Sequence, residues 1–168
     1  MDDNEGHLLK SAESLSIKGL NSDALELCNR VISRSQENYE AYELRSSIFR
    51  KLGDLNNAVE DIGRVIQLMP KNASPYFRRG RYLLKLGENK AAILDFTKAI
   101  ELDNGYFGEA LRFYRAEALL RCNDFEGAIR DCEAMANNYS VSYFDGYGQR
   151  SRDDIELAAR ERILRVHR

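Results

Sequence analysis

The sequence predicts an all-α fold: an α-solenoid of about four helix-turn-helix repeats followed by a C-terminal capping helix. The first observation behind this prediction is a fixed step, because Gly19, Gly53 and Gly87 lie 34 residues apart in the 168-residue chain. The second is that apolar residues within each copy recur at helical spacing. The third is that Pro70 and Pro75 are the only prolines, and helix interiors exclude proline because it lacks an N–H.

The repeat can be followed through four copies. Ala24, Ala58 and Ala92 keep the step of 34, and Ala128 continues the series after a step of 36. The two additional residues fall in the glycine-containing connection at 104–109, which reads NGYFGE. Internal repetition at this length is typical of stacked helical hairpins. We predict one repeat array over 1–142, with units at 5–38, 39–72, 73–106 and 109–142.

Each unit divides into two helices at its glycine. In the third unit, Tyr76, Gly80 and Leu83 lie three to four residues apart, which indicates one helical stripe. Gly87 then supplies the left-handed backbone with which helices end, and a second stripe containing Phe96 follows. One such hairpin cannot bury its apolar faces alone, whereas stacked hairpins can.

On these residues the chain resembles the tetratricopeptide repeat (TPR) proteins over about 5–142. The resemblance implies antiparallel helix pairs and a non-enzymatic protein-binding function, in which the first helices of the units line a concave groove. The second unit carries a shorter version of the pattern: Tyr42, Gly53, Ala58, Leu68 and Pro70. The third unit carries it most fully: Tyr76, Gly80, Gly87, Ala92, Phe96, Ala99 and Leu102.

Charged residues also repeat in phase. An arginine in the first helix of three units precedes an aspartate in the second helix by 16 residues each time. An antiparallel hairpin brings such positions together, so we predict an ion pair in at least two of the three units; the alternative is that both side chains reach solvent separately and contribute little. The predicted pairs are Arg45–Asp61, Arg79–Asp95 and Arg115–Asp131.

The segment 143–168 is predicted to be an aromatic loop and a capping helix that belong to the same domain. Ser151 is a suitable helix cap, and Ile155 and Ala159 lie on a stripe that can cover the last repeat. The aromatic stretch 139–148 either packs on that repeat or enters the groove, and the sequence leaves both open.

Bulk properties argue against several functions. The net charge of −2 gives no basic excess for nucleic acid, and three cysteines at irregular spacing predict no disulfide framework. The acidic start of the sequence has no apolar stretch of signal-peptide length, so we expect a cytoplasmic protein. The two histidines, His7 and His167, lie near opposite ends, and no catalytic or phosphate-binding motif is found. We therefore expect no enzyme activity, no cofactor and no metal site.

The predicted binding site is the groove along the first helices. Its N-terminal half is acidic, and its C-terminal half is an apolar trough of Phe77, Leu84, Phe113 and Leu120. A peptide or helix with an apolar anchor, a basic end and an acidic end fits such a surface. The predicted groove residues are Leu9, Glu13, Glu43, Ser47, Arg50, Phe77, Arg78, Arg81, Leu84, Phe113, Glu117 and Leu120.

Other occupants of the groove stay open at this point. The trough residues can instead pack against the C-terminal loop or a second copy of the chain, which would make a self-associating homodimer. The basic stretch 78–90 suggests RNA binding as a weaker alternative. Within the resemblance, the clamp by which some TPR domains hold a chaperone's C-terminal carboxylate is not expected, because only an arginine matches among its counterparts here: Leu9, Glu13, Leu44, Ser74 and Arg78.

Overall fold

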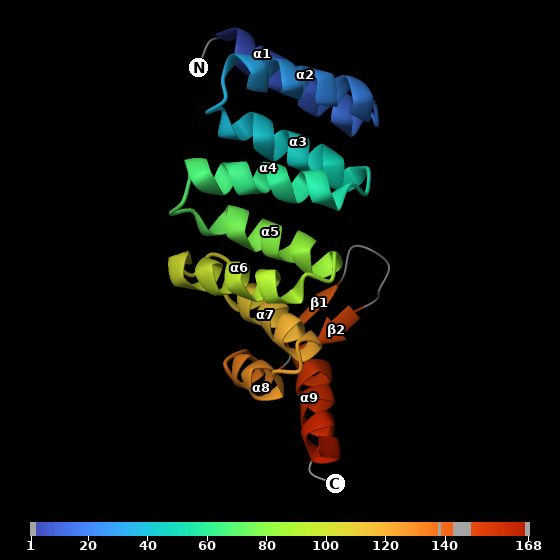
Figure 1. Ribbon diagram of the computed structural model, residues 1–168, viewed down its shortest axis with the longest axis vertical. Helices are drawn as coiled ribbons and strands as arrows, with labels where there is room; N and C mark the ends of the chain where they lie inside the picture. The colour runs from blue at the N-terminus through green and yellow to red at the C-terminus, as the bar shows by residue number, and fades with distance from the viewer. Residues whose placement is uncertain (1–2, 138, 143–148, 167–168) are drawn as a thin grey trace. The chain divides into compact units, whose positions relative to one another are not determined.

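The computed structural model describes residues 3–137, 139–142 and 149–166 (Figure 1). The chain divides into two compact units, 1–82 and 83–168, and the division falls within one helix. The helices are α1 (Asp3–Ile17), α2 (Asn21–Arg34), α3 (Tyr39–Lys51), α4 (Leu55–Leu68), α5 (Ala73–Lys85), α6 (Asn89–Leu102), α7 (Glu109–Arg121), α8 (Phe125–Glu133) and α9 (Arg152–Val166), and the strands are β1 (Ser140–Ser142) and β2 (Gln149–Ser151).

In the N-terminal unit, successive helices pack side by side, α1 on α2, α2 on α3 and α3 on α4 (Figure 1). Small residues occupy the seams: Ala12 and Ala24 are fully buried together with Cys28 and Ile48. Residues without long side chains allow two helices to approach closely, and the dense packing that results stabilises the pair. The helix α3 also contacts α1 directly, so the first helices of the two predicted repeats are neighbours.

The predicted glycine turns end the first helices. Gly19, Gly53 and Gly87 have φ angles of 81°, 80° and 80°, a left-handed conformation that glycine adopts without steric cost. The amide that follows each glycine donates to a carbonyl five residues back, as Asp54 N does to Phe49 O at 2.9 Å. This arrangement satisfies carbonyls that the helix end leaves open. After α7, Asn123 takes the position that glycine has in the other turns, with φ of 62°.

Side-chain caps fix where several helices begin. Asn38 Oδ1 accepts from Ala41 N at 3.0 Å, and Asp124 Oδ1 accepts from Gly127 N at 2.9 Å. The predicted cap at Ser151 is confirmed: its Oγ accepts from Asp154 N at 3.2 Å, at the start of α9. Such caps satisfy amides that the first helical turn leaves without a partner.

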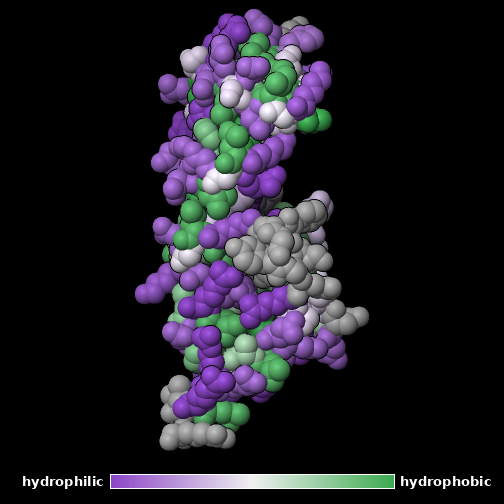
Figure 2. All heavy atoms as spheres, turned by 90° about the vertical axis from the view of Figure 1, so that its right-hand side faces the viewer, coloured by the Kyte–Doolittle hydropathy of each residue, from purple (hydrophilic) through white to green (hydrophobic). Residues whose placement is uncertain are grey.

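Turns at one edge of the N-terminal unit leave large apolar side chains in solvent. Ile17 is 76% exposed, and Leu20 and Leu52, which flank two of the glycines, are about half exposed. Figure 2 views the edge at which these turns lie and shows hydrophobic patches separated by hydrophilic residues over the N-terminal unit. Scattered exposure of this kind is ordinary for a protein surface.

The C-terminal unit adds a two-stranded hairpin to helices α6–α9. β1 and β2 pair antiparallel, with Ser140 opposite Ser151, and the sequence pattern predicted no strand here. The helix α9 packs on α7 and α8, with Ile155 and Ala159 fully buried, so the predicted capping helix is confirmed. The aromatic residues Tyr143, Phe144 and Tyr147 lie outside the described residues.

Two of the predicted arginine–aspartate pairs are present, which confirms the prediction. Arg45 Nε and Nη2 donate to the two carboxylate oxygens of Asp61 at 2.9 and 2.6 Å. Arg115 makes the same two-pronged contact with Asp131, at 2.7 and 2.6 Å. Both aspartates are buried, and paired hydrogen bonds to a charged group are stronger than neutral ones. The third predicted pair, Arg79–Asp95, stays a prediction.

None of the described helices combines the length and the apolar character that crossing a membrane requires. The grouping of the helices into the four predicted repeat units, and of 143–168 with them into one domain, stays a prediction.

Candidate functional site

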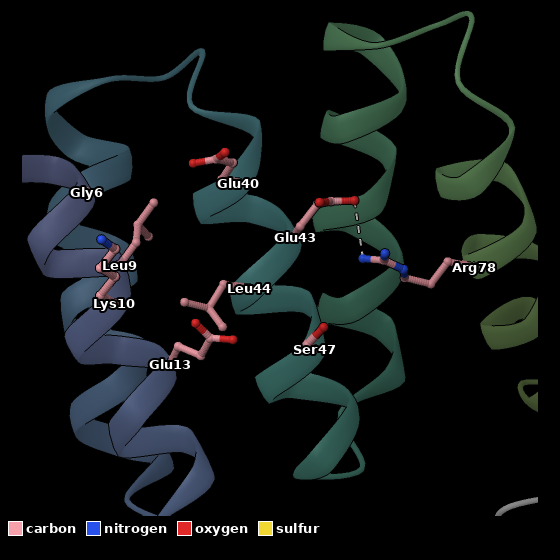
Figure 3. Close-up of a pocket in the computed structure, with 9 residues that line it drawn as sticks. All are labelled: Gly6, Leu9, Lys10, Glu13, Glu40, Glu43, Leu44, Ser47 and Arg78. Atoms are coloured by element: carbon pink, nitrogen blue, oxygen red, sulfur yellow. Dashed lines mark ion pairs between the residues drawn. The ribbon is translucent and has the colours of Figure 1, made fainter. Parts of the chain in front are cut away.

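A pocket of about 590 Å³ lies on the N-terminal unit between α1 and α3, with one contribution from α5 (Figure 3). Its wall combines carboxylates, cations and two leucines. The lining residues are Gly6, Leu9, Lys10 and Glu13 of α1, Glu40, Glu43, Leu44 and Ser47 of α3, and Arg78 of α5.

Helical periodicity places these side chains on one face of each helix. On α1, Leu9 and Glu13 are four residues apart, and Glu43 and Ser47 repeat that spacing on α3. Residues three or four apart share a helix face, so each helix directs a short row of side chains into the space between them. Because α1 and α3 are in contact, the two rows face a common hollow.

The floor of the pocket is apolar. Leu9 is only 8% exposed and packs with the fully buried Val31 and Ala41, and the partly buried Leu44 lies against the same cluster. The floor is therefore rigid, because its leucines are held by the helix core. An apolar floor with a few polar groups around it is the common composition of ligand pockets.

The rim of the pocket is charged. Arg78 Nη1 lies 3.3 Å from Glu43 Oε1, and both side chains are about one-third exposed, so α3 and α5 are linked by an ion pair (Figure 3). Glu13 and Glu40 are exposed and have no hydrogen bond or ion pair with the residues that the structure describes. Lys10 is the second cation. Carboxylates therefore outnumber cations around the hollow, and two of them are available to a ligand.

The structure brings five of the predicted groove residues to this pocket: Leu9, Glu13, Glu43, Ser47 and Arg78. The other four lining residues are not in the predicted set: Gly6, Lys10, Glu40 and Leu44. A signal for all four was present, since each lies one helical turn before a residue that was predicted.

The predicted apolar trough in the C-terminal half assumed that its side chains are open to a ligand, and for three of them this is wrong. Phe113 is fully buried, and Leu84 and Leu120 are about 5% exposed, so these side chains have core positions and do not offer an open surface. Phe113 packs against Tyr114 and Tyr139, with ring centroids 5.7 and 5.9 Å apart. Tyr139 therefore packs on the last predicted repeat, one of the alternatives for the aromatic stretch.

Glu117 is also removed from solvent. Its side chain is 1% exposed and lies between two arginines: Arg121 Nε donates to Oε1 at 2.8 Å, and Arg150 of β2 lies 2.5 Å from Oε2. The Arg150 contact is an ion pair without the alignment of a hydrogen bond. A buried carboxylate must be paired with opposite charge, and one of its two arginines, Arg150, comes from the hairpin.

The remaining predicted residues lie outside the pocket. Arg50 is exposed on α3. On α5, the guanidinium of Arg81 lies 5.7 Å from the centre of the Phe77 ring, a cation–π contact. Because Arg78 is paired with Glu43 and Arg81 covers a ring, the basic stretch offers fewer open cations to RNA than its sequence suggests.

Metal ligands and reactive thiols were sought among the described residues. Among them, no three His, Cys, Asp or Glu side chains gather in a way that could hold a metal ion. All three cysteines are free thiols, and burial raises the pKa of Cys28 to about 11 and that of Cys132 to about 12. A thiol with so high a pKa is a poor nucleophile. Cys122 is partly exposed.

Solved structures with a similar fold include MamA, with a TM-score of 0.73 and 19% identity over 80% of this chain and 72% of MamA. MamA from Desulfovibrio magneticus RS-1 gives 0.72 and 18%, over 80% and 75% of the two chains. YrrB, described as a TPR protein with an unusual peptide-binding site, gives 0.67 and 18%, over 76% and 64%. At these identities the likeness shows the fold alone, and it confirms the all-α, TPR-like class.

No curated protein sequence matches the chain. Residues 11–143 match the family described as the ETO1 C-terminal domain. This match covers more than half of the sequence and includes the pocket helices from residue 11 onward. The chain belongs to the ETO1 C-terminal domain family, and its fold is TPR-like.

Proposed function

We propose that this protein is a non-enzymatic adaptor that binds a peptide or helix of another protein along the first helices of its N-terminal unit. The observation that carries the proposal is the pocket of about 590 Å³ between α1 and α3, with its rigid leucine floor and charged rim. Concave, largely preformed pockets with an apolar floor are the usual place of ligand capture. The TPR-like fold supports the class of function, and the peptide-binding site of YrrB, a protein of similar fold, supports a peptide as the ligand.

The rim chemistry favours a partner other than an acidic C-terminus. Glu13 lies at one of the positions compared with the chaperone clamp, and it would repel a carboxylate, as would Glu40, which lines the same pocket. The chaperone-tail function is therefore excluded from the proposal. Free thiols at all three cysteines support a reducing compartment such as the cytoplasm.

The test is to fill the pocket and compare bound partners. A Ser47→Arg variant places a long side chain into the hollow from α3, while Ser33→Arg adds the same side chain at an exposed position of α2 outside it. Affinity capture with quantitative mass spectrometry is run with wild type and both variants, after circular dichroism shows equal helix content. The proposal expects partners that Ser33→Arg retains and Ser47→Arg loses. Equal recovery with both variants would contradict it.

The alternatives give different results in two further measurements. A homodimer would shift the mass in sedimentation equilibrium as concentration rises, and the proposal expects a monomer. An RNA binder would retard labelled RNA at low salt, with an affinity that falls steeply as salt rises. The ion pair of Arg78 and the ring contact of Arg81 predict little such binding.

A further inference from the structure

Two first helices carry the same pair of side chains at corresponding positions. On α1, Leu9 is followed four residues later by Glu13; on α7, Phe113 is followed four residues later by Glu117. Each member of the second pair lies 104 residues after its counterpart, which equals three repeat steps. Both helices therefore present an apolar side chain with a carboxylate one turn beyond it on the same face.

On α7 this pair is contacted by residues of the chain's own two-stranded pair, β1 and β2, and its flank. The residues that flank the hairpin supply an aromatic ring to the apolar member, because Tyr139 packs on Phe113 with centroids 5.9 Å apart. The strand β2 supplies a guanidinium to the carboxylate, because Arg150 forms an ion pair with Glu117. An aromatic ring from beside β1 and a guanidinium from β2 are thus the observed partners of this kind of helix face.

On α1 the same pair is open. Leu9 forms the floor of the pocket, and Glu13 projects from the wall without a partner among the described residues. Glu40 faces the same space from α3, again without a described partner (Figure 3). Two cations line the pocket, Lys10 and Arg78. Arg78 already forms an ion pair with Glu43 at 3.3 Å, so Lys10 is the lining cation that remains to offset Glu13 and Glu40. The charge of the hollow is complementary to a cation.

We propose that the pocket binds the Arg or Lys side chain of an extended segment of another protein, with a neighbouring aromatic or aliphatic side chain on the leucine floor. Glu13 and Glu40 hold the cation as Glu117 holds Arg150, and Leu9 and Leu44 take the apolar side chain. The inference rests on the proposed peptide-binding function and specifies its ligand.

The experiment begins with an unbiased random peptide library displayed on phage and selected on the immobilised full chain. The expected consensus is Arg or Lys close to an aromatic or aliphatic residue. The enriched peptide is then synthesised with a fluorescent label and measured by polarisation against Glu13→Gln. The expected weakening is about fivefold, the size of one exposed ion pair. The matched control is Glu26→Gln, an exposed glutamate of α2 outside the pocket, which should bind as wild type does.

A double-mutant cycle locates the contact. Replacing the peptide's Arg or Lys with Gln should weaken binding to wild type and should have little further effect on Glu13→Gln, because the same ion pair is already lost. A consensus without a basic residue would overturn the inference. So would a double variant, Glu13→Gln with Glu40→Gln in one chain, that binds the peptide as tightly as wild type does. If such peptides still fail to bind Ser47→Arg, the proposed function survives; if they bind it normally, that function fails as well.

A second copy of this chain is the competing occupant. It carries Tyr139 beside β1 and Arg150 on β2, so it has the side chains that the pocket is proposed to bind. Sedimentation of wild type and Glu13→Gln decides between them. Concentration-dependent dimers that Glu13→Gln abolishes would overturn the assignment to another protein, and monomers for both support it.

Discussion

The ion pair between Arg115 and Asp131 makes the sharpest stability prediction. Asp131→Leu removes a carboxylate whose side chain is 6% exposed and leaves the guanidinium of Arg115, 21% exposed, without its two short hydrogen bonds. Breaking one side of a buried pair costs about 3–5 kcal/mol. The arginine has partial access to water, and it keeps a hydrogen bond to Thr97 at 3.2 Å, so the lower end, about 3 kcal/mol, is expected.

The first repeat provides the matched control. Ser11 and Leu27 lie at the positions where other repeats have arginine and aspartate, so the chain already contains a hairpin without the pair. The double variant Arg115→Ser, Asp131→Leu recreates that arrangement and should lose only about 1 kcal/mol, since no charge is left without a partner. The double variant should therefore be about 2 kcal/mol more stable than Asp131→Leu alone.

The assay is urea unfolding followed by far-ultraviolet circular dichroism. With a slope of about 2 kcal/mol per molar urea, the single variant should unfold about 1.5 M earlier than wild type, and the double variant about 0.5 M earlier. A single variant within about 0.5 kcal/mol of wild type would refute the reasoning, because the pair would then behave as two solvated charges. A double variant as unstable as the single one would show that packing, not charge, sets the loss.

Three further predictions concern backbone, thiols and charge. Gly53→Ala should lower the free energy of unfolding, measured in urea, by about 1 kcal/mol, because φ is 80°. The added methyl meets nothing within 4 Å, so the loss comes from the backbone conformation alone. The control Gly63→Ala, inside α4, should cause no such loss, and equal losses would contradict the backbone argument. In the native protein Cys122 should react first with a thiol reagent at pH 8, because burial raises the pKa of the other two thiols to about 11 and about 12; rapid labelling of all three, read by mass spectrometry, would oppose this. Hydrogen bonds from two arginines lower the pKa of Glu156. Its stabilising effect is therefore present above a pH of about 4.5 and is lost as pH falls through the lowered pKa. The melting temperatures of wild type and Glu156→Gln should converge in acid, and a difference that stays constant with pH would refute this prediction.

Much of the fold follows from periodicity in the sequence. The glycines at 19, 53 and 87 adopt the left-handed turns that their spacing predicted, and the pairs Arg45–Asp61 and Arg115–Asp131 form because an antiparallel hairpin fixes which residues face one another. A repeat also locates the helix faces, which is why five of the pocket residues were among those predicted.

The C-terminal part could not be predicted in the same way. Strands of three residues carry no detectable alternation, and the contact of Glu117 with Arg150 joins positions that no repeat relates. The groove prediction therefore treated Phe113 and Leu120 as open when the structure buries them.

The burial of Phe113 also changes which experiments are informative. A Phe113→Ala change would open a cavity in the C-terminal unit and cost about 3–5 kcal/mol, so lost binding would report unfolding. Substitutions at the rim, such as Glu13 and Ser47, alter the pocket while leaving the buried clusters intact.

The account depends most on the pocket between α1 and α3 as the place where a partner is held. A crystal structure of the full chain with a library-selected peptide tests this directly. The account predicts a guanidinium or ammonium group of the peptide within about 4 Å of the Glu13 or Glu40 carboxylate, with an apolar side chain on Leu9. A peptide bound on any other surface, with this pocket filled by solvent, would contradict it.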